Sequence, residues 1–391
     1  MDFELTDKQK KLKKEVHELL EKEIDPIVTK TDRDRSFSAE KWKGVLKKLV
    51  PYGVISGHAP KELGGLADGE TDHITQGLLM EELAWTWAAL SEIVIINSLA
   101  TERIKFIGTP AQAKRFVPGI AKGDILFCSG NSEPEHGSDA AAYKTLAVRD
   151  GDTWTVNGTK TWSTGGFFAD HCLLLAQIDP SRGAKGLQHF VLDKKVSPWE
   201  AEEIYLTGVR SEGLGLLKFK NVKVPHEYML GEEPGTSYKK QLIQWGIIRA
   251  YVAFQEIGVA RRALEAAVDY SLKRIQFGKP IASFQMVQDK IVQATMELEA
   301  ARLMAYRACH VLNSGERSAL ACSTAKVFAT QVAMRVTDIS VDIHGSRGLV
   351  EDEIPERCYR EARTFMHPDG PFNINKLIAG NEILGINAIR R

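Results

Sequence analysis

The spacing of apolar residues changes twice along this 391-residue chain, and that change constrains the fold more than any other feature. From Thr6 to about Lys122, apolar residues recur at intervals of three and four, which is typical of helices. Between about Leu126 and Gly231 the pattern alternates, as it does in strands. Helical spacing returns after Pro234-Gly235. The sequence therefore predicts a multidomain α+β protein with helices at both ends.

These changes of spacing define the expected domains. We expect an all-α N-terminal domain over residues 1–125, a central β-barrel-like domain over 126–233 and a C-terminal four-helix bundle over 234–391. At roughly 150 residues per domain, the length allows two or three domains. Within the bundle, long helices are expected over 284–312 and 317–344.

Turn signals place the strands of the central domain. Asp150-Gly151 and Asn157-Gly158 are both typical of two-residue hairpin turns, and they bracket the alternating segment Thr153–Val156. Further strands are expected over 171–178, 188–193 and 216–222. The middle of the chain is thus predicted to form a sheet of short, hairpin-connected strands.

Charge and composition exclude several classes of protein. The 51 basic and 51 acidic residues cancel, so no nucleic-acid partner is expected. No run of about 20 apolar residues could insert into a membrane. The segment Met1–Lys8 carries three acids and no apolar run of the kind found in secretory leaders. The five cysteines are far apart and form no CxxC pair, which predicts a reduced, cytoplasmic protein.

Several common catalytic signatures are missing. The nearest approach to the dinucleotide fingerprint GxGxxG, Gly213-Leu214-Gly215, lacks the third glycine. Neither HExxH nor paired cysteine and histidine ligands occur, so no metal is expected. No GxSxG elbow supports a hydrolase. The chemistry must come from other segments.

Four segments are ordinary singly but informative as an ordered set. Ser132-Glu133-Pro134 precedes Gly137-Ser138-Asp139, and Trp162-Ser163-Thr164 precedes a glycine pair. Arg274 opens a segment that continues through Phe277-Gly278-Lys279 to Gln285, and a late one contains Gly345 and Gly348. Each alone would be a loop, a strand end or a helix terminus. In this order they resemble the acyl-CoA dehydrogenase family, over almost the whole chain.

The resemblance implies FAD held without a Rossmann unit, its isoalloxazine ring between the central domain and the C-terminal helices. By motif position, Ser132 and Thr164 would hydrogen-bond the pyrimidine edge and N5 of the flavin, and Trp162 would pack against the ring. Short hydroxyls suit this role because they polarise the ring without adding a charge.

The resemblance also implies that subunits share their cofactors. Arg274 and Phe277 would contact the adenine and pyrophosphate end of a neighbouring subunit's FAD, and Gly345 would allow the pyrophosphate a close approach. The expected assembly is a homotetramer built as a dimer of dimers. The implied partners are an acyl-CoA substrate and an electron-transfer flavoprotein that takes up the electrons.

Other implied contacts are distributed along the chain. The remaining cofactor positions are Ser138, Gln285 and Asn373, and the substrate positions are Ser138, Arg249 and Gly370. The chain departs from the family pattern at several positions. Gly246 stands where an acidic residue is common, Pro371 replaces a threonine, and Asn373 replaces a glutamine.

The implied reaction removes a proton from the carbon next to a CoA thioester while a hydride leaves the following carbon for flavin N5. Asp369 falls where many family members carry a glutamate base. Aspartate is shorter by about 1.5 Å of reach, and general-base work needs roughly 2.6–3.2 Å between heavy atoms. The motif also implies that the backbone N–H of Asp369 binds the thioester oxygen. Either the backbone or the substrate lies closer than in those members, or Asp369 is not the base. Asp369 is the leading candidate for the proton acceptor.

Glu92 is the second candidate. It lies in the apolar helical segment Leu90–Ile96, and the following Asn97-Ser98-Leu99 aligns it with residues that line the acyl cavity of family members. Some members that act on ring acids resemble this layout. Ile248 shows that the alternative glutamate base of isovaleryl-type members is missing. An ordinary charge on a helix surface stays an alternative interpretation of Glu92.

The predicted function is FAD-dependent dehydrogenation of an acyl-CoA thioester to an enoyl-CoA, with a branched or cyclic acyl group expected. One alternative is non-oxidising or reductive chemistry on the same fold, including 1,4-elimination on a cyclic enoyl-CoA through Glu92. Another is a flavin-free scaffold, which the departures at Gly246, Pro371 and Asn373 would favour. Bleaching of a yellow preparation by a thioester would separate enzyme from scaffold.

Overall fold

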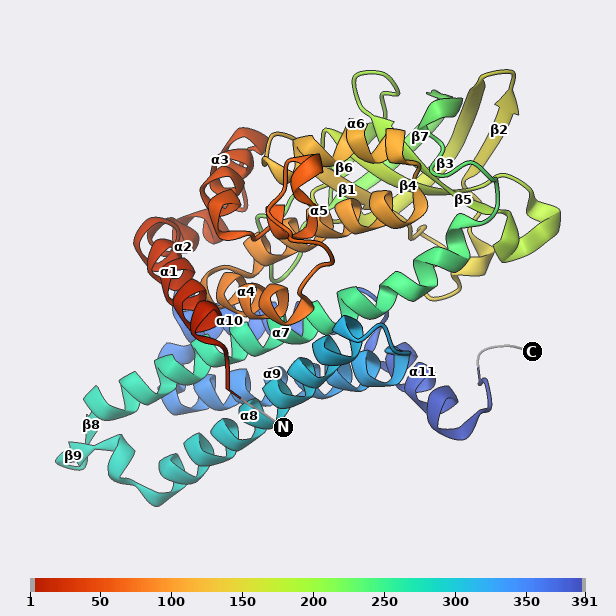
Figure 1. Ribbon diagram of the computed structural model, residues 1–391. Helices are drawn as coiled ribbons and strands as arrows, with labels where there is room; N and C mark the ends of the chain where they lie inside the picture. The colour runs from red at the N-terminus through yellow and green to blue at the C-terminus, as the bar shows by residue number, and fades with distance from the viewer. Residues whose placement is uncertain (1–3, 389–391) are drawn as a thin grey trace.

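The computed structural model describes residues 4–388. The start of the expected N-terminal domain, residues 1–3, and the end of the C-terminal one, residues 389–391, lie outside the described residues. The ribbon passes from a group of helices into a curled sheet and then into a second group of long helices (Figure 1). This arrangement confirms the predicted fold class.

The N-terminal part consists of six α-helices. They are α1 (Asp7–Glu23), α2 (Asp25–Asp34), α3 (Ala39–Leu49), α4 (His73–Thr86), α5 (Ala88–Ile107) and α6 (Pro110–Ala121). Thr6 and Gln9 form a reciprocal capping box at the start of α1. In α5, most residues from Ala88 to Ile107 are buried, because this helix is apolar on all sides. Two charged residues of α5, Glu92 and Arg103, are buried.

The central part is a seven-stranded sheet. Its strands are β1 (Phe127–Gly130), β2 (Leu146–Asp150), β3 (Thr153–Ser163), β4 (His171–Gln177), β5 (Leu187–Asp193), β6 (Glu200–Glu203) and β7 (Gly215–Pro225). The order is β1-β4-β2-β3-β7-β6, and β5 pairs with β4. The strands expected over 171–178, 188–193 and 216–222 are confirmed. The hairpin at Asp150-Gly151 is confirmed too, since Asp150 pairs with Thr153.

The hairpin turn expected at Asn157-Gly158 is wrong. β3 continues through both residues, and the Asn157 side chain accepts the backbone N–H of Asn221 on β7 at 2.8 Å. The register of β3 against β7 shifts at this point. A Cβ at position 158 would lie 2.5 Å from Thr145 Oγ1. Gly158 therefore permits a close approach between backbones rather than a turn.

A second register shift lies at the end of β3, between Lys160 and Ser163. Trp162 takes a left-handed conformation there, with φ of 57°. Thr161 and Ser163 are buried, whereas the side chain of Trp162 is 59% exposed. Because a bulge changes which side chains face inward, this one turns the indole outward.

Long helices dominate the C-terminal part. They are α7 (Ser237–Lys273), α8 (Gln285–Asn313), α9 (Ala319–His344), α10 (Ile354–Phe365) and α11 (Phe372–Leu384). The small hairpin of β8 (Ile275–Gln276) and β9 (Lys279–Pro280) joins α7 to α8. The helices expected over 284–312 and 317–344 are confirmed. Helix α7 packs against α4 and α5 on one side and α8, α9 and α10 on the other.

Close packing ties α7 to the N-terminal helices. A Cβ at Gly258 would lie 2.3 Å from the carbonyl of Glu81, and one at Gly77 would lie 2.4 Å from the ring of Phe254. These glycines bring α4 and α7 into direct contact. Within residues 4–388, no helix is both long and apolar enough to cross a membrane.

Candidate active site

Charged side chains gather where α5, α7, α9 and the α10–α11 loop meet. Glu92 lies on α5, Glu256 on α7, Lys326 on α9 and Asp369 in the loop. Glu92, Glu256 and Lys326 are 4%, 0% and 1% exposed, and Asp369 is partly buried. The interpretation of Glu92 as a helix-surface charge is therefore wrong. Because acids are rarely buried without cations, this cluster is a candidate site.

The loop around Asp369 has an unusual backbone. Asp369 and Gly370 have φ values of 57° and 92°, so two successive residues are left-handed. The Lys326 ammonium donates to the carbonyl of Pro368, and to that of Gly370 at 2.8 Å. The Asn375 amide donates to the same Gly370 carbonyl at 2.7 Å. The loop is therefore held from α9 and from α11.

Opposing influences act on the carboxyl group of Asp369. Burial raises its pKa, and the positive charges of Lys326, Arg103 and Arg249 oppose that rise. The net pKa lies above the usual value. A raised pKa makes this carboxylate a stronger base than a free aspartate, which suits a general base.

Glu92 faces the same space. Its carboxyl group lies 3.5 Å from the Thr164 hydroxyl, and its second oxygen has no hydrogen-bond partner. Burial and the negative charge of Asp369 raise the pKa of Glu92 to about 8. Glu92 therefore holds its proton at neutral pH. The structure brings both predicted candidates for the base together, beside Thr164.

Sequence analysis missed three charged members of this site. They are Arg103 on α5, Glu256 on α7 and Lys326 on α9. Arg103 is 2% exposed, contacts the Ser129 hydroxyl at 3.4 Å and interacts with Asp369. Burial lowers its pKa to about 10. The only sequence signal was a charged residue inside an otherwise apolar helical pattern, which by itself does not identify a partner.

The first predicted segment lies next to the second. The backbone N–H of Thr161 donates to the carbonyl of Ser132 at 2.9 Å. Glu133 is buried and fixes the loop, because it accepts the N–H groups of Lys144 and Thr145 at 2.7 and 2.8 Å and the Lys160 ammonium at 2.9 Å. Ser132 is therefore anchored beside the end of β3. Ser138, farther along the same loop, is exposed.

The end of β3 suits a flat aromatic cofactor. Trp162 presents an exposed indole, and Thr164 is a buried hydroxyl next to the Glu92 carboxyl group. An apolar face beside short hydroxyls fits an isoalloxazine ring, which has a π surface and hydrogen-bonding edges. Ser132, Trp162 and Thr164 are the residues of this chain that would hold it.

A second group of predicted residues lies elsewhere. Arg274 and Gly345 line a cavity of about 500 Å³ together with Arg347. Gly345 has φ of 60°, and no atom would contact a Cβ there within 4 Å. Two arginines beside an open glycine backbone suit a pyrophosphate. Phe277 is 93% exposed at the adjoining β8–β9 hairpin.

These two groups are far apart within one chain. Arg274 follows the last residue of α7, whose 37 residues span about 55 Å, and the β8–β9 hairpin lies at the opposite end of the molecule from the sheet (Figure 1). Gln285, at the start of α8, is exposed. One subunit does not bring Arg274 and Trp162 onto a single cofactor. Joint contacts with one FAD require a second subunit.

Two of the three implied substrate positions, Arg249 and Gly370, lie at the charged cluster or beside it, whereas Ser138 lies in the exposed loop after β1. Arg249 is 6% exposed, its Nε atom has no hydrogen-bond partner, and its charge interacts with Asp369. Gly370 is fixed by Lys326 and Asn375. Asn373 is exposed in the first turn of α11. The buried amide that holds the loop is Asn375.

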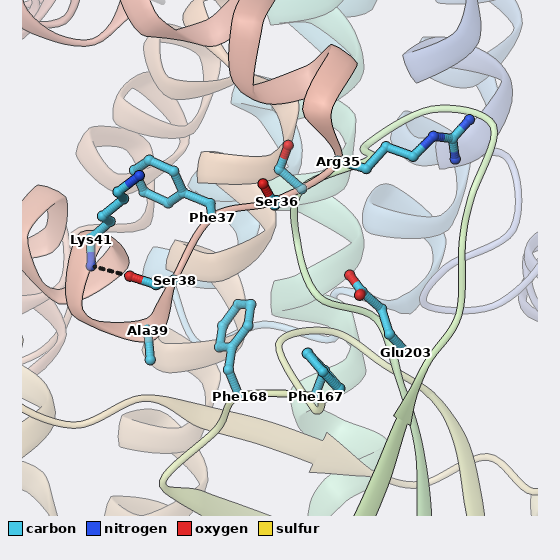
Figure 2. Close-up of a pocket in the computed structure, with 10 residues that line it drawn as sticks. Arg35, Ser36, Phe37, Ser38, Ala39, Lys41, Phe167, Phe168 and Glu203 are labelled. Atoms are coloured by element: carbon cyan, nitrogen blue, oxygen red, sulfur yellow. Dashed lines mark hydrogen bonds between the residues drawn. The ribbon is translucent and has the colours of Figure 1, made fainter.

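Another cavity, of about 450 Å³, lies outside the predicted site. Its walls come from the α2–α3 connection, the turn after β3 and the end of β6 (Figure 2). Phe37, Phe168 and Glu203 contribute to them. None of the predicted cofactor or substrate residues lines this cavity.

Comparison with known proteins identifies all three parts of the chain. The models for the N-terminal, middle and C-terminal domains of acyl-CoA dehydrogenases match residues 6–124, 128–222 and 240–384. The chain is 33% identical over 393 residues to a short-chain-specific acyl-CoA dehydrogenase of Megasphaera elsdenii, covering 98% of this chain and 100% of that one. It is 31% identical over 387 residues to an acryloyl-CoA reductase (NADH) of Anaerotignum propionicum, covering 98% and 96%.

A solved structure supports the same relationship. The glutaryl-CoA dehydrogenase of Mycobacterium smegmatis in complex with FADH2 has a TM-score of 0.90 at 25% identity, covering 99% of this chain and 97% of that one. The matched regions follow the order of helices, sheet and helices described above. The chain belongs to the acyl-CoA dehydrogenase family and is an oxidoreductase whose cofactor is FAD.

Proposed function

We propose that this protein dehydrogenates an acyl-CoA thioester to the enoyl-CoA, with Asp369 as the proton acceptor. The observation that supports this proposal is the position of Asp369 in a rigidly held loop, among Lys326, Arg103 and Arg249. These cations favour the charged carboxylate, which has to be present before a proton can be removed. Burial keeps the base from becoming too weak, because it raises the pKa.

In the proposed step, the acyl-CoA loses one proton and one hydride. The Asp369 carboxylate takes the proton from the carbon next to the thioester, and the electron pair left behind becomes the new carbon–carbon double bond. The bound FAD, held by Ser132, Trp162 and Thr164, would supply the acceptor for the hydride that leaves the following carbon. The backbone N–H of Asp369 would donate to the thioester oxygen, where negative charge develops during proton removal.

Glu92 would form part of the acyl-binding wall. At neutral pH it is a neutral carboxylic acid beside Thr164, so it can donate a hydrogen bond but does not compete with Asp369 for the first proton. A branched or cyclic acyl group is the proposed substrate, because the shorter Asp369 and the buried Glu92 both reshape the site compared with a glutamate base and an apolar wall.

Two further reactions are alternatives within the family. Elimination on a cyclic enoyl-CoA would use Glu92 and Asp369 as two acid–base groups on one substrate, and their mutual electrostatic influence favours this possibility. Enoyl-CoA reduction is the second, because a relative is named an acryloyl-CoA reductase. An electron-transfer flavoprotein as acceptor, a homotetramer and a cytoplasmic location stay predictions.

Anaerobic titration of the FAD-loaded protein tests the proposal. Straight-chain, branched and cyclic acyl-CoAs are added separately, and the absorbance of oxidised flavin is followed. We expect at least one acyl-CoA to bleach the flavin stoichiometrically. Turnover with the flavin remaining oxidised would favour elimination, and rapid NADH-driven loss of an enoyl-CoA would favour reduction. An absence of bleaching by every thioester would contradict the proposed dehydrogenation.

A further inference from the structure

We propose that Lys326 is a positioning residue for the reaction: its ammonium group binds the two carbonyls that flank Asp369 and thereby aims that residue at the substrate. The inference rests on the proposed function, in which Asp369 accepts the proton. It adds a residue of α9 that would contact neither substrate nor cofactor. Lys326 would act only through the backbone of the loop.

The contacts of Lys326 are specific to this loop. Its side chain is 1% exposed and crosses from α9 to the α10–α11 connection. The ammonium group donates to the carbonyls of Pro368 and Gly370, the residues on either side of Asp369. A lysine ammonium has three N–H donors and no acceptor. One cation therefore fixes the Pro368–Asp369 and Gly370–Pro371 peptide units, one on each side of the Asp369–Gly370 bond.

The loop needs such support because its conformation is unfavourable. Asp369 has φ of 57°, which residues with a Cβ rarely adopt, and Gly370 follows with φ of 92°. Conformations of this kind persist only where the surroundings hold them. Lys326 supplies two of the bonds that do so, and Asn375 supplies the third, at 2.7 Å.

The contact with Lys326 also determines the direction in which the backbone N–H of Asp369 points. The structure has no cis peptide bonds among its described residues, so the N–H of Asp369 points opposite to the carbonyl of Pro368. That carbonyl faces Lys326 on α9. The N–H of Asp369 therefore points away from α9. Lys326 would orient both the N–H that binds the thioester oxygen and the carboxylate that removes the proton.

The charges around Lys326 come from three other parts of the protein. Asp369 faces it from the loop, Glu256 and Arg249 from α7, and Glu92 from α5. Burial lowers the pKa of Lys326 to about 8, and Asp369 is the strongest influence in the opposite direction. Burial also raises the pKa of Glu256 to about 8, so Glu256 is mostly uncharged at neutral pH. Asp369 is therefore the main counter-charge of Lys326.

Three variants test the proposal. Lys326→Met keeps most of the length of the side chain but removes its charge and donors, Lys326→Gln keeps a neutral donor, and Lys326→Arg keeps the charge. Thr337→Val is the control, because Thr337 is buried on the same helix about three turns away and bonds only within that helix. Each variant is first compared with the wild type in FAD content and thermal unfolding.

Single-turnover bleaching by an active acyl-CoA gives the main result. We expect Lys326→Met to bleach about 10²-fold more slowly, the loss expected for roughly 1 Å of misplacement, with little change in KM. The bleaching rates of Lys326→Gln and Lys326→Arg should lie between those of Lys326→Met and the wild type. The rate of Thr337→Val should match that of the wild type. Removing the cation should also raise the pKa of Asp369, so the acidic limb of the rate profile should move to higher pH.

Hydrogen exchange gives a result that does not depend on activity. Backbone amides of residues 366–371 should exchange faster in Lys326→Met and Lys326→Gln than in Thr337→Val, with or without FAD. If Lys326→Met fails to fold, the same measurements on Lys326→Gln decide the question. A folded, FAD-containing Met or Gln variant with the wild-type rate, pH profile and exchange would overturn the proposal. Failure of the proposed function is distinguishable, because the wild type itself would then not be bleached by any thioester.

Discussion

Helix α7 borders two buried clusters of charge that differ in how they are paired. In the first, the structural cluster, Arg261 binds Glu82 through two hydrogen bonds of 2.8 Å, and Arg302 binds Glu81 at 3.1 and 3.2 Å. Burial would raise the pKa of Glu82, but His17 and Arg261 together lower it to about 2. This cluster joins α4 to α7 and α8 with complementary charges.

In the second, the site cluster of Glu92, Glu256, Lys326 and Asp369, pairing is incomplete. Among the described residues, none of its carboxylates forms a salt bridge. Burial raises the pKa of Glu92, Glu256 and Asp369. Buried charges without direct partners destabilise a fold, so their presence points to chemistry rather than to support. The same helix thus borders a cluster that stabilises and one that is poised to react.

The largest expected effect is a loss of activity when a carboxylate of the site cluster is replaced. Asp369→Asn removes the proposed base and should lower the bleaching rate about 10³-fold, within the range for general bases, without lowering thermal stability. Glu92→Gln should lower the rate by a much smaller factor, because Glu92 is already protonated. Stopped-flow bleaching at saturating acyl-CoA measures both rates. An Asp369→Asn variant that bleaches at the wild-type rate would exclude this base, and a larger loss in Glu92→Gln would exchange their roles.

The second prediction concerns the ion pair between Arg261 and Glu82 in the structural cluster. Glu82→Gln leaves Arg261 buried without its main partner and should lower the free energy of unfolding by about 3 kcal/mol, as for other broken buried ion pairs. The folded variant should keep its bleaching rate. Glu265→Gln is the control, since Glu265 is 53% exposed, lies 3.8 Å from Arg261 and should change stability by less than about 1 kcal/mol. Urea unfolding measures both, and equal losses would contradict the comparison.

The smallest effect concerns Glu256 and pH. Its pKa is raised to about 8 from a usual value of 4.5, so the stability associated with its protonated form is complete at low pH and is lost as the pH rises through about 8. Glu256→Gln stays neutral at every pH and removes that loss. The substitution should therefore favour folding more at pH 8.5 than at pH 5.5, by about 1–3 kcal/mol, in urea unfolding at the two pH values. A variant with the same change in stability at both pH values would show that Glu256 does not titrate in this range.

The sequence contains enough information for the fold and for part of the site. The long helices over 284–312 and 317–344 follow from periodicity, which depends only on local spacing. The prediction of a turn at Asn157-Gly158 was wrong because the same dipeptide also serves a strand that packs closely on Thr145. Local turn chemistry does not distinguish these cases, since the neighbouring strand decides which one applies.

Partners within the site depend on tertiary contacts. Asp369 and Glu92 were found through motif position, and the structure places them in one site although 277 residues separate them (369 minus 92). Lys326 and Arg103 were missed, because a single charge in an apolar helix reveals neither its depth nor its partner. Lys326 lies 42 residues from Pro368 in sequence, and only the packing of α9 against the loop brings the two together.

The bulge at the end of β3 determines which face of the sheet the side chain of Trp162 occupies. In a regular strand, position 162 would share the inward face with Trp154, Val156 and Lys160, all of which are buried. The left-handed conformation of Trp162 interrupts this alternation, and its indole faces outward. A regular strand of the same length would instead place the indole in the sheet interior, although the tryptophan itself would remain.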